Sequence, residues 1–262
     1  MKREKLTVLI TGGSKGIGLE LAKQFAAHGH DLILVARNRD ALEAAAGIIE
    51  GKRGVKVTVF AFDLADPQCP QRLFDAVTAE GLQVDVLVNN AGFGHGGEFA
   101  ETDLSAELDM IQVNVASLVH LTKLFLQPMI LRRKGRILNV GSTAGFHPGP
   151  LHSIYFATKA FILSFSQAID EELRNTGVTV TCLTPGATAT HFAERANLSN
   201  TVLFNVTGVA DAESVARYGY AATMRGDRLA IPGIKNKFVA QAGRLIPRAI
   251  ATTLARKVQE NR

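Results

Sequence analysis

The sequence lacks tryptophan and contains only two cysteines, Cys69 and Cys182, among its 262 residues. Two thiols are too few for a disulfide framework or a structural zinc site, and their scarcity favours a reducing compartment. Aromatic residues are also rare, at 6% of the chain, whereas hydrophobic residues make up 47%. This composition is that of a globular protein that can bury a substantial core.

Long apolar runs are absent as well. The run from Leu6 to Ile10 stops at Thr11 and is shorter than the apolar region of a secretory signal. No stretch approaches the ~20 apolar residues that a membrane-spanning helix needs. We therefore expect a cytoplasmic protein. Internal repeats, low-complexity runs and Pro/Ser-rich linkers are missing too, so nothing in the sequence divides the chain into separate domains.

The net charge of +5 is concentrated at one end of the chain. Seven cationic residues and a single acidic one, Glu260, lie between Lys235 and Arg262. The rest of the chain is close to neutral and has no basic stripe, so nucleic acid is not an expected partner.

Short β-rich runs alternate with longer helical patterns along the chain. The candidate strands are Leu6 to Ile10, Asp31 to Ala36, Val55 to Phe60, Val84 to Asn89, Arg136 to Val140, Val178 to Leu183 and Leu229 to Ile231. Their continuous apolar character is typical of strands buried on both faces of a parallel sheet. We predict an α/β fold with a single Rossmann-type doubly wound domain, a seven-stranded parallel sheet and helices on both faces.

Helices are predicted at Ile17 to His28, Asp40 to Gly51, Pro70 to Glu80, Ser105 to Leu131, Ser153 to Asn175 and Asp211 to Met224. Within two of them, at Asp109 to Leu131 and Ile154 to Ile169, apolar residues are dense enough to cover more than one face. These helices either pack on the sheet in the ordinary way or pair across a subunit boundary in a homodimer or homotetramer.

A glycine-rich turn follows the first predicted strand and leads into an amphipathic helix. Its sequence is Thr11-Gly12-Gly13-Ser14-Lys15-Gly16-Ile17-Gly18. Glycines here allow a tight turn and the close approach of a pyrophosphate to free N–H groups at the helix N-terminus. The spacing differs from the commoner Gly-x-Gly-x-x-Gly fingerprint, and the Gly-Lys-Ser/Thr of a Walker loop is missing. The turn indicates a dinucleotide cofactor.

The second predicted strand ends at Ala36, and Arg37 follows where an NAD site would carry an acidic residue for the ribose 2′-hydroxyl. An acid there would repel a 2′-phosphate, whereas Arg37 can clamp one through charge-assisted hydrogen bonds. Lys15 in the glycine turn supplies a second cation. The two residues predict NADP(H), against the alternative that both are solvated surface charges.

Tyr155 and Lys159 stand four residues apart, and Ser142 lies thirteen residues before the tyrosine, just past a predicted strand. Side chains at i and i+4 share one helix face, so the ammonium can lie close to the phenol oxygen. A nearby positive charge lowers the pKa of a phenol from its usual value of about 10 and makes it a usable acid near neutral pH. Taken alone, the Tyr155–Lys159 pair is weak evidence for catalysis, because two residues on the surface of an ordinary helix could have the same spacing.

Together these residues resemble the short-chain dehydrogenase/reductase family. The resemblance covers nearly the whole chain and uses five motifs in order, namely the glycine turn, Asp63, Asn89-Asn90-Ala91-Gly92, the set Asn114, Ser142, Tyr155 and Lys159, and Pro185-Gly186. It implies that Tyr155 is the acid or base at a carbonyl oxygen, which Ser142 polarises. It also implies that Lys159 binds the nicotinamide ribose and tunes Tyr155, and that Asn114 holds a water linking Lys159 to solvent.

The same resemblance implies the cofactor contacts. The glycine turn contributes Gly12, Ser14, Lys15, Gly16, Ile17 and Gly18; Asp63 and Leu64 hold the adenine; Asn90, Ala91 and Gly92 line the adenosine side; and Pro185, Gly186 and Thr188 pack on the nicotinamide.

Elementary chemistry agrees with this assignment. Reduction of a ketone builds negative charge on oxygen as hydride arrives, so two hydroxyl donors such as Ser142 and Tyr155 suit the transition state. A serine hydrolase with His147 or His152 as base is the rival interpretation, but no Gly-x-Ser-x-Gly elbow surrounds Ser142. The spacing of His95, His147 and His152 does not suit a metal site and favours a pocket-lining or loop role.

Apolar residues on the predicted loops indicate a hydrophobic ketone or alcohol as substrate. They are Phe93, Phe99, Phe146, Leu151, Phe192 and Phe204. The expected substrate site consists of Phe93, Phe146 and Phe192 with Ser142 and Tyr155. A cofactor-binding sensor or scaffold with little turnover is the competing hypothesis, and the presence of all four catalytic residues favours the enzyme.

The end of the chain departs from the β-ketoacyl carrier-protein reductase branch of the family. It resembles instead bacterial reductases of unassigned substrate and relatives of hydroxysteroid and long-chain ketoacyl reductases. We assign residues 1–234 to the catalytic domain and 235–262 to a basic amphipathic C-terminal extension. That extension could lie on an anionic membrane or cap the pocket or the dimer, and Pro247, which interrupts the helical pattern, favours the second.

Overall fold

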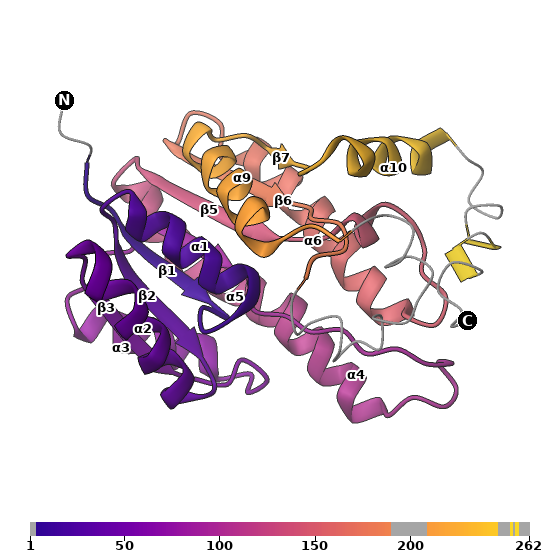
Figure 1. The fold of residues 1–262 in the computed structure, drawn as a ribbon, viewed down its shortest axis with the longest axis horizontal. Helices are drawn as coiled ribbons and strands as arrows, with labels where there is room; N and C mark the ends of the chain where they lie inside the picture. The colour runs from indigo at the N-terminus through magenta and orange to yellow at the C-terminus, as the bar shows by residue number, and fades with distance from the viewer. Residues whose placement is uncertain (1–3, 190–208, 246–251, 254, 257–262) are drawn as a thin grey trace.

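The computed structural model describes residues 4–189, 209–245, 252–253 and 255–256. In this part of the chain seven strands form one parallel sheet in the order β3-β2-β1-β4-β5-β6-β7. The strands are β1 (Thr7–Thr11), β2 (Asp31–Ala36), β3 (Val57–Ala61), β4 (Val86–Asn89), β5 (Gly135–Val140), β6 (Val178–Leu183) and β7 (Leu229–Ala230). The predicted seven-stranded sheet is confirmed (Figure 1).

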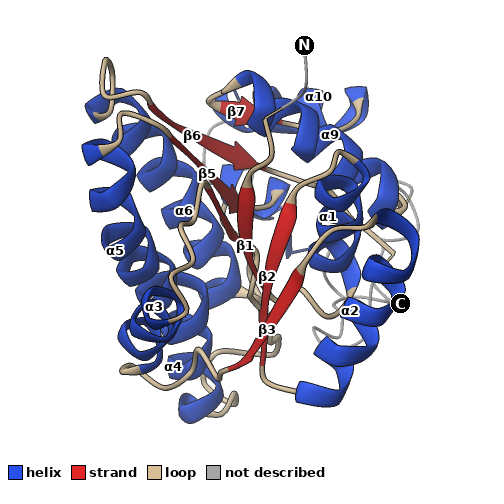
Figure 2. Ribbon diagram, turned by 90° about the vertical axis from the view of Figure 1, so that its left-hand side faces the viewer, coloured by secondary structure: helices blue, strands red, loops and turns tan. Residues whose placement is uncertain are grey.

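Helices cover both faces of this sheet (Figure 2). They are α1 (Gly16–Ala27), α2 (Arg39–Arg53), α3 (Cys69–Ala79), α4 (Leu104–Ile111), α5 (Ser117–Leu131), α6 (Ser153–Glu172), α9 (Ala212–Arg225) and α10 (Ile234–Leu245). Buried residues of α1, α2 and α9 pack on one face, and those of α3 and α5 pack on the other, with Ile169 of α6 beside them. The doubly wound arrangement follows from strands that are apolar on both sides.

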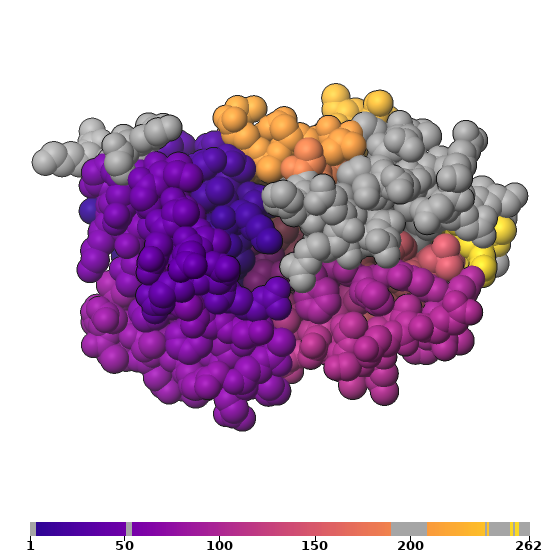
Figure 3. All heavy atoms as spheres, turned by 60° about the horizontal axis from the view of Figure 1, so that its bottom comes forward, coloured from indigo at the N-terminus to yellow at the C-terminus, as the bar shows by residue number. Residues whose placement is uncertain are grey.

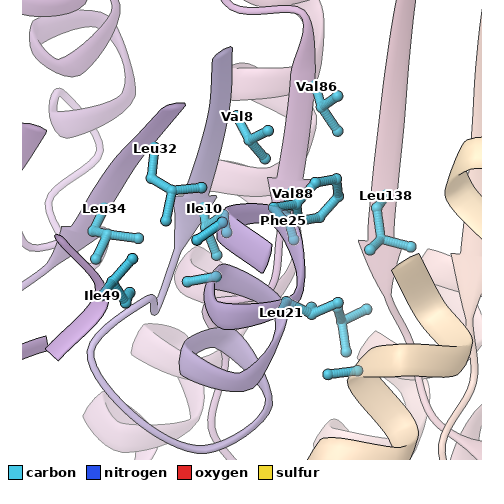
Figure 4. Close-up of a cluster of buried hydrophobic side chains, with 14 of the residues drawn as sticks. Val8, Ile10, Leu21, Phe25, Leu32, Leu34, Ile49, Val86, Val88 and Leu138 are labelled. Atoms are coloured by element: carbon cyan, nitrogen blue, oxygen red, sulfur yellow. The ribbon is translucent and has the colours of Figure 1, made fainter. Parts of the chain in front are cut away.

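Strand β1 shows this two-sided burial residue by residue. Val8 and Ile10 join the cluster that contains Leu21 and Phe25 of α1, whereas Leu9 belongs to the cluster on the opposite face. All five side chains are fully buried. Figure 4 shows the first of these clusters. Burial on both faces leaves the ends of the strands and their connecting loops to carry polar chemistry.

Short-range signals fix the ends of the connecting helices. Helix α2 begins after Asn38, whose side chain accepts a backbone N–H, and it ends at Gly54 with a left-handed φ of 63°. Helix α9 repeats the pattern, with Asp211 as the N-cap and Gly226, at φ 76°, as the C-cap. Side-chain oxygens satisfy free N–H groups at a helix start, and glycine adopts the left-handed conformation that stops a helix.

The order of the strands reverses direction at β1. The chain moves outward from β1 to β2 and β3, then crosses to β4 on the other side of β1. Loops at the carboxyl ends of β1 and β4 therefore diverge and open a crevice, which is the usual ligand site of an open α/β sheet. In Figure 3 the first part of the chain, indigo to purple, forms one side of the molecule, and the magenta to orange segments form the other.

The predicted helix from Ser105 to Leu131 is not a continuous α-helix. A π-helical turn, η1 (Gln112–Ala116), separates α4 from α5. Asn114 lies within it and is buried, with both ends of its side-chain amide bonded to the backbone of Phe93. The wider turn adds a residue to the helix and rotates this side chain toward the loop after β4.

By length and composition the stretch Leu104–Leu131 could also cross a membrane, with an 18-residue window of mean hydropathy 1.2. This differs from the expectation that no such stretch is present. Leu121 and Phe125 are buried in the core cluster of the sheet, whereas the side chains of Leu104 and Leu108 are more than half exposed. The stretch is therefore apolar on an inner face and on an outer face.

Candidate active site

The glycine turn after β1 is built as a cradle. Gly12 and Gly16 have left-handed φ angles of 65° and 57°. The side-chain amide of Asn90, which follows β4, fixes the turn, because its Nδ2 donates to the carbonyls of Thr11 (2.8 Å) and Gly12 (3.2 Å). A Cβ on Gly18 would lie 2.2 Å from the Gly12 oxygen, so helix α1 packs directly on the turn. Only glycine permits these contacts.

Helix α1 begins at this turn with its N–H groups uncapped. Its N-cap, Lys15, makes no side-chain capping bond, and the first turn holds no acidic residue. Free N–H groups at a helix N-terminus attract the oxygens of a phosphate. The cradle therefore fits the pyrophosphate of a dinucleotide.

Two cations lie beside the cradle. The side chain of Arg37 is 60% exposed, and its guanidinium lies 4.0 Å from the carboxylate of Asp63. Lys15 is also exposed, and both residues line the same cleft. An ion pair this exposed is weak, so Arg37 is available to a phosphate. Asp63 accepts the backbone N–H of Ala65 at 3.0 Å, which fixes its loop at the end of β3.

Ser142, Tyr155 and Lys159 meet at the carboxyl end of β5. Ser142 follows β5 and caps the 3-10 turn η2 (Thr143–Phe146), with its Oγ accepting from Ala144 N at 3.1 Å. Its hydroxyl also forms a hydrogen bond with Tyr155. Lys159 lies one turn along α6, with its Nζ 5.7 Å from the centroid of the Tyr155 ring. The structure brings the predicted trio together.

The pKa of Tyr155 differs in direction from the sequence-based expectation. Burial raises it to about 12, and the hydrogen bond from Ser142 opposes this rise in part. The expected lowering by Lys159 does not appear, and the Lys159 ammonium donates instead to the carbonyl of Val140 at 3.0 Å. Desolvation destabilises the buried phenolate more than the hydrogen bond from Ser142 stabilises it. Tyr155 therefore holds its proton at neutral pH.

Lys159 is itself perturbed. Burial lowers its pKa to about 8, and the neighbouring Cys182 opposes this only in part. Only 6% of the residue is exposed, which agrees with desolvation as the cause. A lysine with this pKa exchanges its proton near physiological pH.

Asn114 ties the π turn to the catalytic helix. Its Oδ1 accepts from Phe93 N (3.1 Å), and its Nδ2 donates to Phe93 O (2.9 Å) and to Thr158 Oγ1 (3.2 Å). Thr158 in turn donates to the carbonyl of Tyr155 at 2.7 Å. Asn114 thus positions the helix that carries Tyr155 and Lys159. Its predicted role in holding a water stays a prediction.

These features line one continuous cleft with a volume of about 660 Å³. The predicted site residues that line it are Gly12, Ser14, Lys15, Gly16, Ile17, Arg37, Asp63, Leu64, Asn90, Ala91, Gly92, Phe93, Ser142, Tyr155, Lys159, Pro185, Gly186 and Thr188. Gly18 and Asn114 lie behind its wall. The cleft runs from the glycine turn to the catalytic trio, so a bound molecule can reach both.

The expected substrate aromatics separate into three cases. Phe93 lines the cleft, whereas Phe146 packs against the cluster of Leu118 and Ile162 behind η2. Phe146 therefore does not line the cleft. Phe192 lies outside the described residues.

Several lining residues had no signal in the sequence. Phe156 follows Tyr155 on α6, and Asn236 comes from α10, after the last strand. Gly186 accommodates Asn236 so closely that a Cβ would lie 2.5 Å from its Oδ1. The turn Pro232-Gly233, with Gly233 at φ 87°, sends the chain back over the cleft. A Pro-Gly pair past the last strand was the only available hint.

Of the three histidines, His95 and His147 are half-buried and only His152 is buried. His147 lines the cleft, whereas His152 is 5% exposed and sits at the start of α6. Burial lowers the pKa of His152, and a hydrogen bond to the backbone of His95 opposes this shift. Among the described residues, no group of three or more His, Cys, Asp or Glu side chains could hold a metal ion.

A family comparison agrees with this geometry. The model of the short chain dehydrogenases matches residues 6–201, which include the glycine turn, Ser142, Tyr155 and Lys159. The chain belongs to the short-chain dehydrogenase family. This short-chain dehydrogenase has the Rossmann-type fold described above, which its family shares.

Curated relatives of this short-chain dehydrogenase include very-long-chain 3-oxoacyl-CoA reductases. The protein of Bos taurus is 37% identical over 194 residues, covering 71% of this chain and 60% of its own length. That of Homo sapiens is 36% identical over 192 residues, with the same coverage. The matched region thus spans about three fifths of these relatives.

Solved structures are similar over almost the whole chain. A short-chain dehydrogenase from Sphingobium yanoikuyae in complex with NADPH is 31% identical, with a TM-score of 0.81 and coverage of 92% of this chain and 93% of that one. L-Sorbose reductase from Gluconobacter frateurii, complexed with NADPH and L-sorbose, is 26% identical, with a TM-score of 0.76 and coverage of 88% and 97%.

Proposed function

We propose that this short-chain dehydrogenase is an NADP(H)-dependent carbonyl reductase, which also catalyses the reverse oxidation of the alcohol. The observation that carries the proposal is the Ser142 and Tyr155 hydroxyls, hydrogen-bonded to each other at the end of a cleft that begins at a phosphate cradle. The NADPH complexes of similar structures support the choice of cofactor. The 3-oxoacyl substrates in the names of its relatives support a ketone.

The chain's own residues account for the protonation half of the reaction. Bound NADPH supplies the hydride. Ser142 donates a hydrogen bond to the carbonyl oxygen and polarises it, and Tyr155 gives that oxygen its phenolic proton. A phenol with a pKa of about 12 is fully protonated at neutral pH, which is the form that reduction needs. Lys159, whose Nζ lies 5.7 Å from the centroid of the Tyr155 ring, is proposed to bind the hydroxyls of the nicotinamide ribose.

The preference for NADP(H) over NAD(H) rests on the second loop of the cleft. Ala36 and Arg37 occupy the place where an acidic residue would repel a 2′-phosphate, and Arg37 and Lys15 flank it from two loops. Asp63 is the acidic residue near Arg37, and its carboxylate is 50% exposed. Its Oδ1 accepts the N–H of Ala65 at 3.0 Å, which keeps the carboxylate on its own loop.

The substrate end of the cleft supports a ketone with an apolar body. Phe93, Phe156 and Ala144 line it next to Tyr155. Pockets lined by apolar side chains with a few convergent polar groups bind such molecules. The test is to offer the purified protein a panel of apolar ketones, acyl thioesters and steroids and to monitor the oxidation of NADPH by its absorbance. Oxidation of NADPH by at least one class is expected, and none with any class would leave only a cofactor-binding sensor or scaffold.

The protein is also proposed to form a homodimer or homotetramer through its long helices. Leu104, Leu108 and Ile111 of α4 are 69%, 54% and 37% exposed, and Phe161 of α6 is 40% exposed. Helices α4 and α6 pack against each other, so these side chains lie on neighbouring elements. An apolar face of this kind is suited to a second copy of itself.

A weak membrane contact through the C-terminal basic helix is proposed as well. On α10, Ile234 and Phe238 are one turn apart and 75% and 73% exposed, with the exposed Lys235 and Lys237 beside them. The opposite side of the helix carries the buried Ala240. An apolar outer face flanked by lysines is suited to an anionic lipid surface. The protein is otherwise proposed to be cytoplasmic.

A further inference from the structure

We propose that the ketone reduced here also carries hydrogen-bond donors, hydroxyl or amide N–H groups, which His147 and Asn236 accept. The inference rests on the carbonyl reductase function and narrows its substrate class. It follows from the hydrogen-bonding capacity of two side chains that line the same cleft as Tyr155. Each of them places a side-chain N–H on a protein carbonyl, and the acceptor atom at the other end of the group receives no hydrogen bond from the described residues.

His147 has a defined tautomer. Its Nδ1 lies 3.1 Å from the carbonyl oxygen of Pro148, and a carbonyl only accepts hydrogen bonds, so Nδ1 carries the proton. In the neutral imidazole, which has a single N–H, Nε2 is then an acceptor. The ring packs at 5.4 Å from the ring of Phe156, which holds its orientation. No other described residue contacts His147 through a hydrogen bond.

Asn236 is oriented in the same way. Its Nδ2 donates to the carbonyl of Pro232 at 2.7 Å, so the amide cannot be reversed without facing two oxygens toward each other. The Oδ1 then lies over Gly186, within 2.5 Å of the place where a Cβ would be. Within the described part of the chain, no donor reaches this oxygen.

The two side chains line the same cleft as the Ser142 and Tyr155 hydroxyls. His147 follows η2, the turn that Ser142 caps, and Asn236 lies on α10, which packs against η2. The Ser142 hydroxyl is itself 3.4 Å from the carbonyl of Pro185, next to Gly186. The site thus offers donors to the substrate carbonyl at Ser142 and Tyr155, and acceptors to its neighbouring groups at His147 and Asn236.

This division selects against a purely apolar ketone. A methyl or an ether oxygen placed against His147 Nε2 or Asn236 Oδ1 removes water from an acceptor and returns no hydrogen bond. A hydroxyl or an amide N–H satisfies it. A site built to bind an O–H or N–H discriminates strongly against the analogue that lacks it. We expect about tenfold or more in kcat/KM for one such group.

The experiment compares 2-hydroxyacetophenone with 2-methoxyacetophenone at saturating NADPH. The two ketones share the ring, the carbonyl and the neighbouring oxygen, which carries a hydrogen in the first and a methyl group in the second. The wild-type protein is expected to favour the hydroxy ketone by roughly tenfold or more in kcat/KM. His147→Phe and Asn236→Leu are each expected to bring this ratio toward one, and His147→Gln, which keeps an acceptor, to retain most of it. NADPH binding by each variant, measured by fluorescence, checks its folding.

The outcomes separate the inference from the function on which it rests. If both ketones are reduced with a wild-type ratio near one, the substrate inference is wrong and the reductase stands. If the wild-type ratio is high but neither variant changes it, the assignment to His147 and Asn236 is wrong. If the protein oxidises NADPH with neither these ketones nor the wider panel, the carbonyl reductase function falls, and the inference with it.

Discussion

At the scale of single residues, Lys159 combines catalytic position with a cost to stability. Its pKa is about 8 in the folded protein, below its ordinary value of about 10.5, because burial disfavours the charged form. Below pH 8 the lysine is charged in both the folded and the unfolded chain, and the folded state bears the full desolvation. Between pH 8 and 10.5 the folded lysine loses its proton, and the penalty disappears.

We therefore expect Lys159→Met to abolish turnover yet raise the stability of the protein. The gain should be on the order of 3 kcal/mol at pH 7 and fall to nothing by about pH 10.5. Thermal unfolding of both proteins across this pH range measures it, with the exposed Lys56→Met as control. A Tm difference that stays constant with pH would refute the desolvation account.

Arg37 tests the cofactor preference at the same scale. Arg37→Ala removes a charge-assisted contact to the 2′-phosphate, worth about 1.5 to 3 kcal/mol, so NADPH binding should weaken roughly tenfold or more. NADH has no such phosphate and should bind as before. Fluorescence titration with both cofactors gives the two Kd values.

Arg39→Ala is the matched control for Arg37. Arg39 is similarly exposed, at 62%, and pairs with Glu43 at 3.5 Å, but it does not line the cleft. An equal loss of affinity for NADPH and NADH in Arg37→Ala would remove the 2′-phosphate argument.

At the scale of elements, the outer face of α4 tests the proposed assembly. Leu108→Asp places a charge in an apolar face that a second copy would bury, so the protein should dissociate to a monomer. Light scattering after gel filtration gives the mass. Ile48→Asp is the control, since Ile48 of α2 is exposed to a similar extent, at 51%, on the other face of the sheet. A monomeric wild-type protein would count against the dimer.

Helix α10 offers a second test at this scale. Ile234→Ser with Phe238→Ser removes the apolar outer face and should reduce co-sedimentation with vesicles that contain anionic lipid. Vesicles of neutral lipid should bind the wild type poorly, because they offer no anionic headgroups to Lys235 and Lys237. The control is Ile48→Ser. Binding unchanged by the double substitution, or by deletion of residues 235–262, would show that the helix does not contact the membrane.

The elements themselves were predictable to different degrees. The strands and helices such as α1, α2 and α9 follow from apolar runs, caps and glycines that act within a few residues. The π turn at Gln112–Ala116 does not, because it depends on the bonds of Asn114 to Phe93, which lie 21 positions apart. The contact of Asn236 on α10 with Gly186, 50 positions earlier in the chain, could not be predicted from local sequence either.

At the scale of the whole molecule, the sequence predicted the site residues that belong to motifs at the ends of strands. It did not predict the features that depend on how side chains pack in the folded protein. Parallel strands bring the loops after β1, β4, β5 and β6 to one edge, so residues far apart in sequence share a cleft. Sequence spacing does not reveal burial, and the expected lowering of the Tyr155 pKa was therefore wrong in direction. Nor does it show that Phe146 turns away from the cleft or that Asn236 closes over it.

The central claim is that Tyr155 gives its proton to the substrate oxygen. A single measurement tests it most directly, namely the single-turnover rate of NADPH oxidation by Tyr155→Phe with a ketone that the wild type reduces. Phenylalanine keeps the ring packed against Phe156 and removes only the hydroxyl, so NADPH should still bind with a similar Kd. The rate should fall by about a hundredfold or more, because the proton donor is lost. A Tyr155→Phe rate equal to that of the wild type would contradict the assignment.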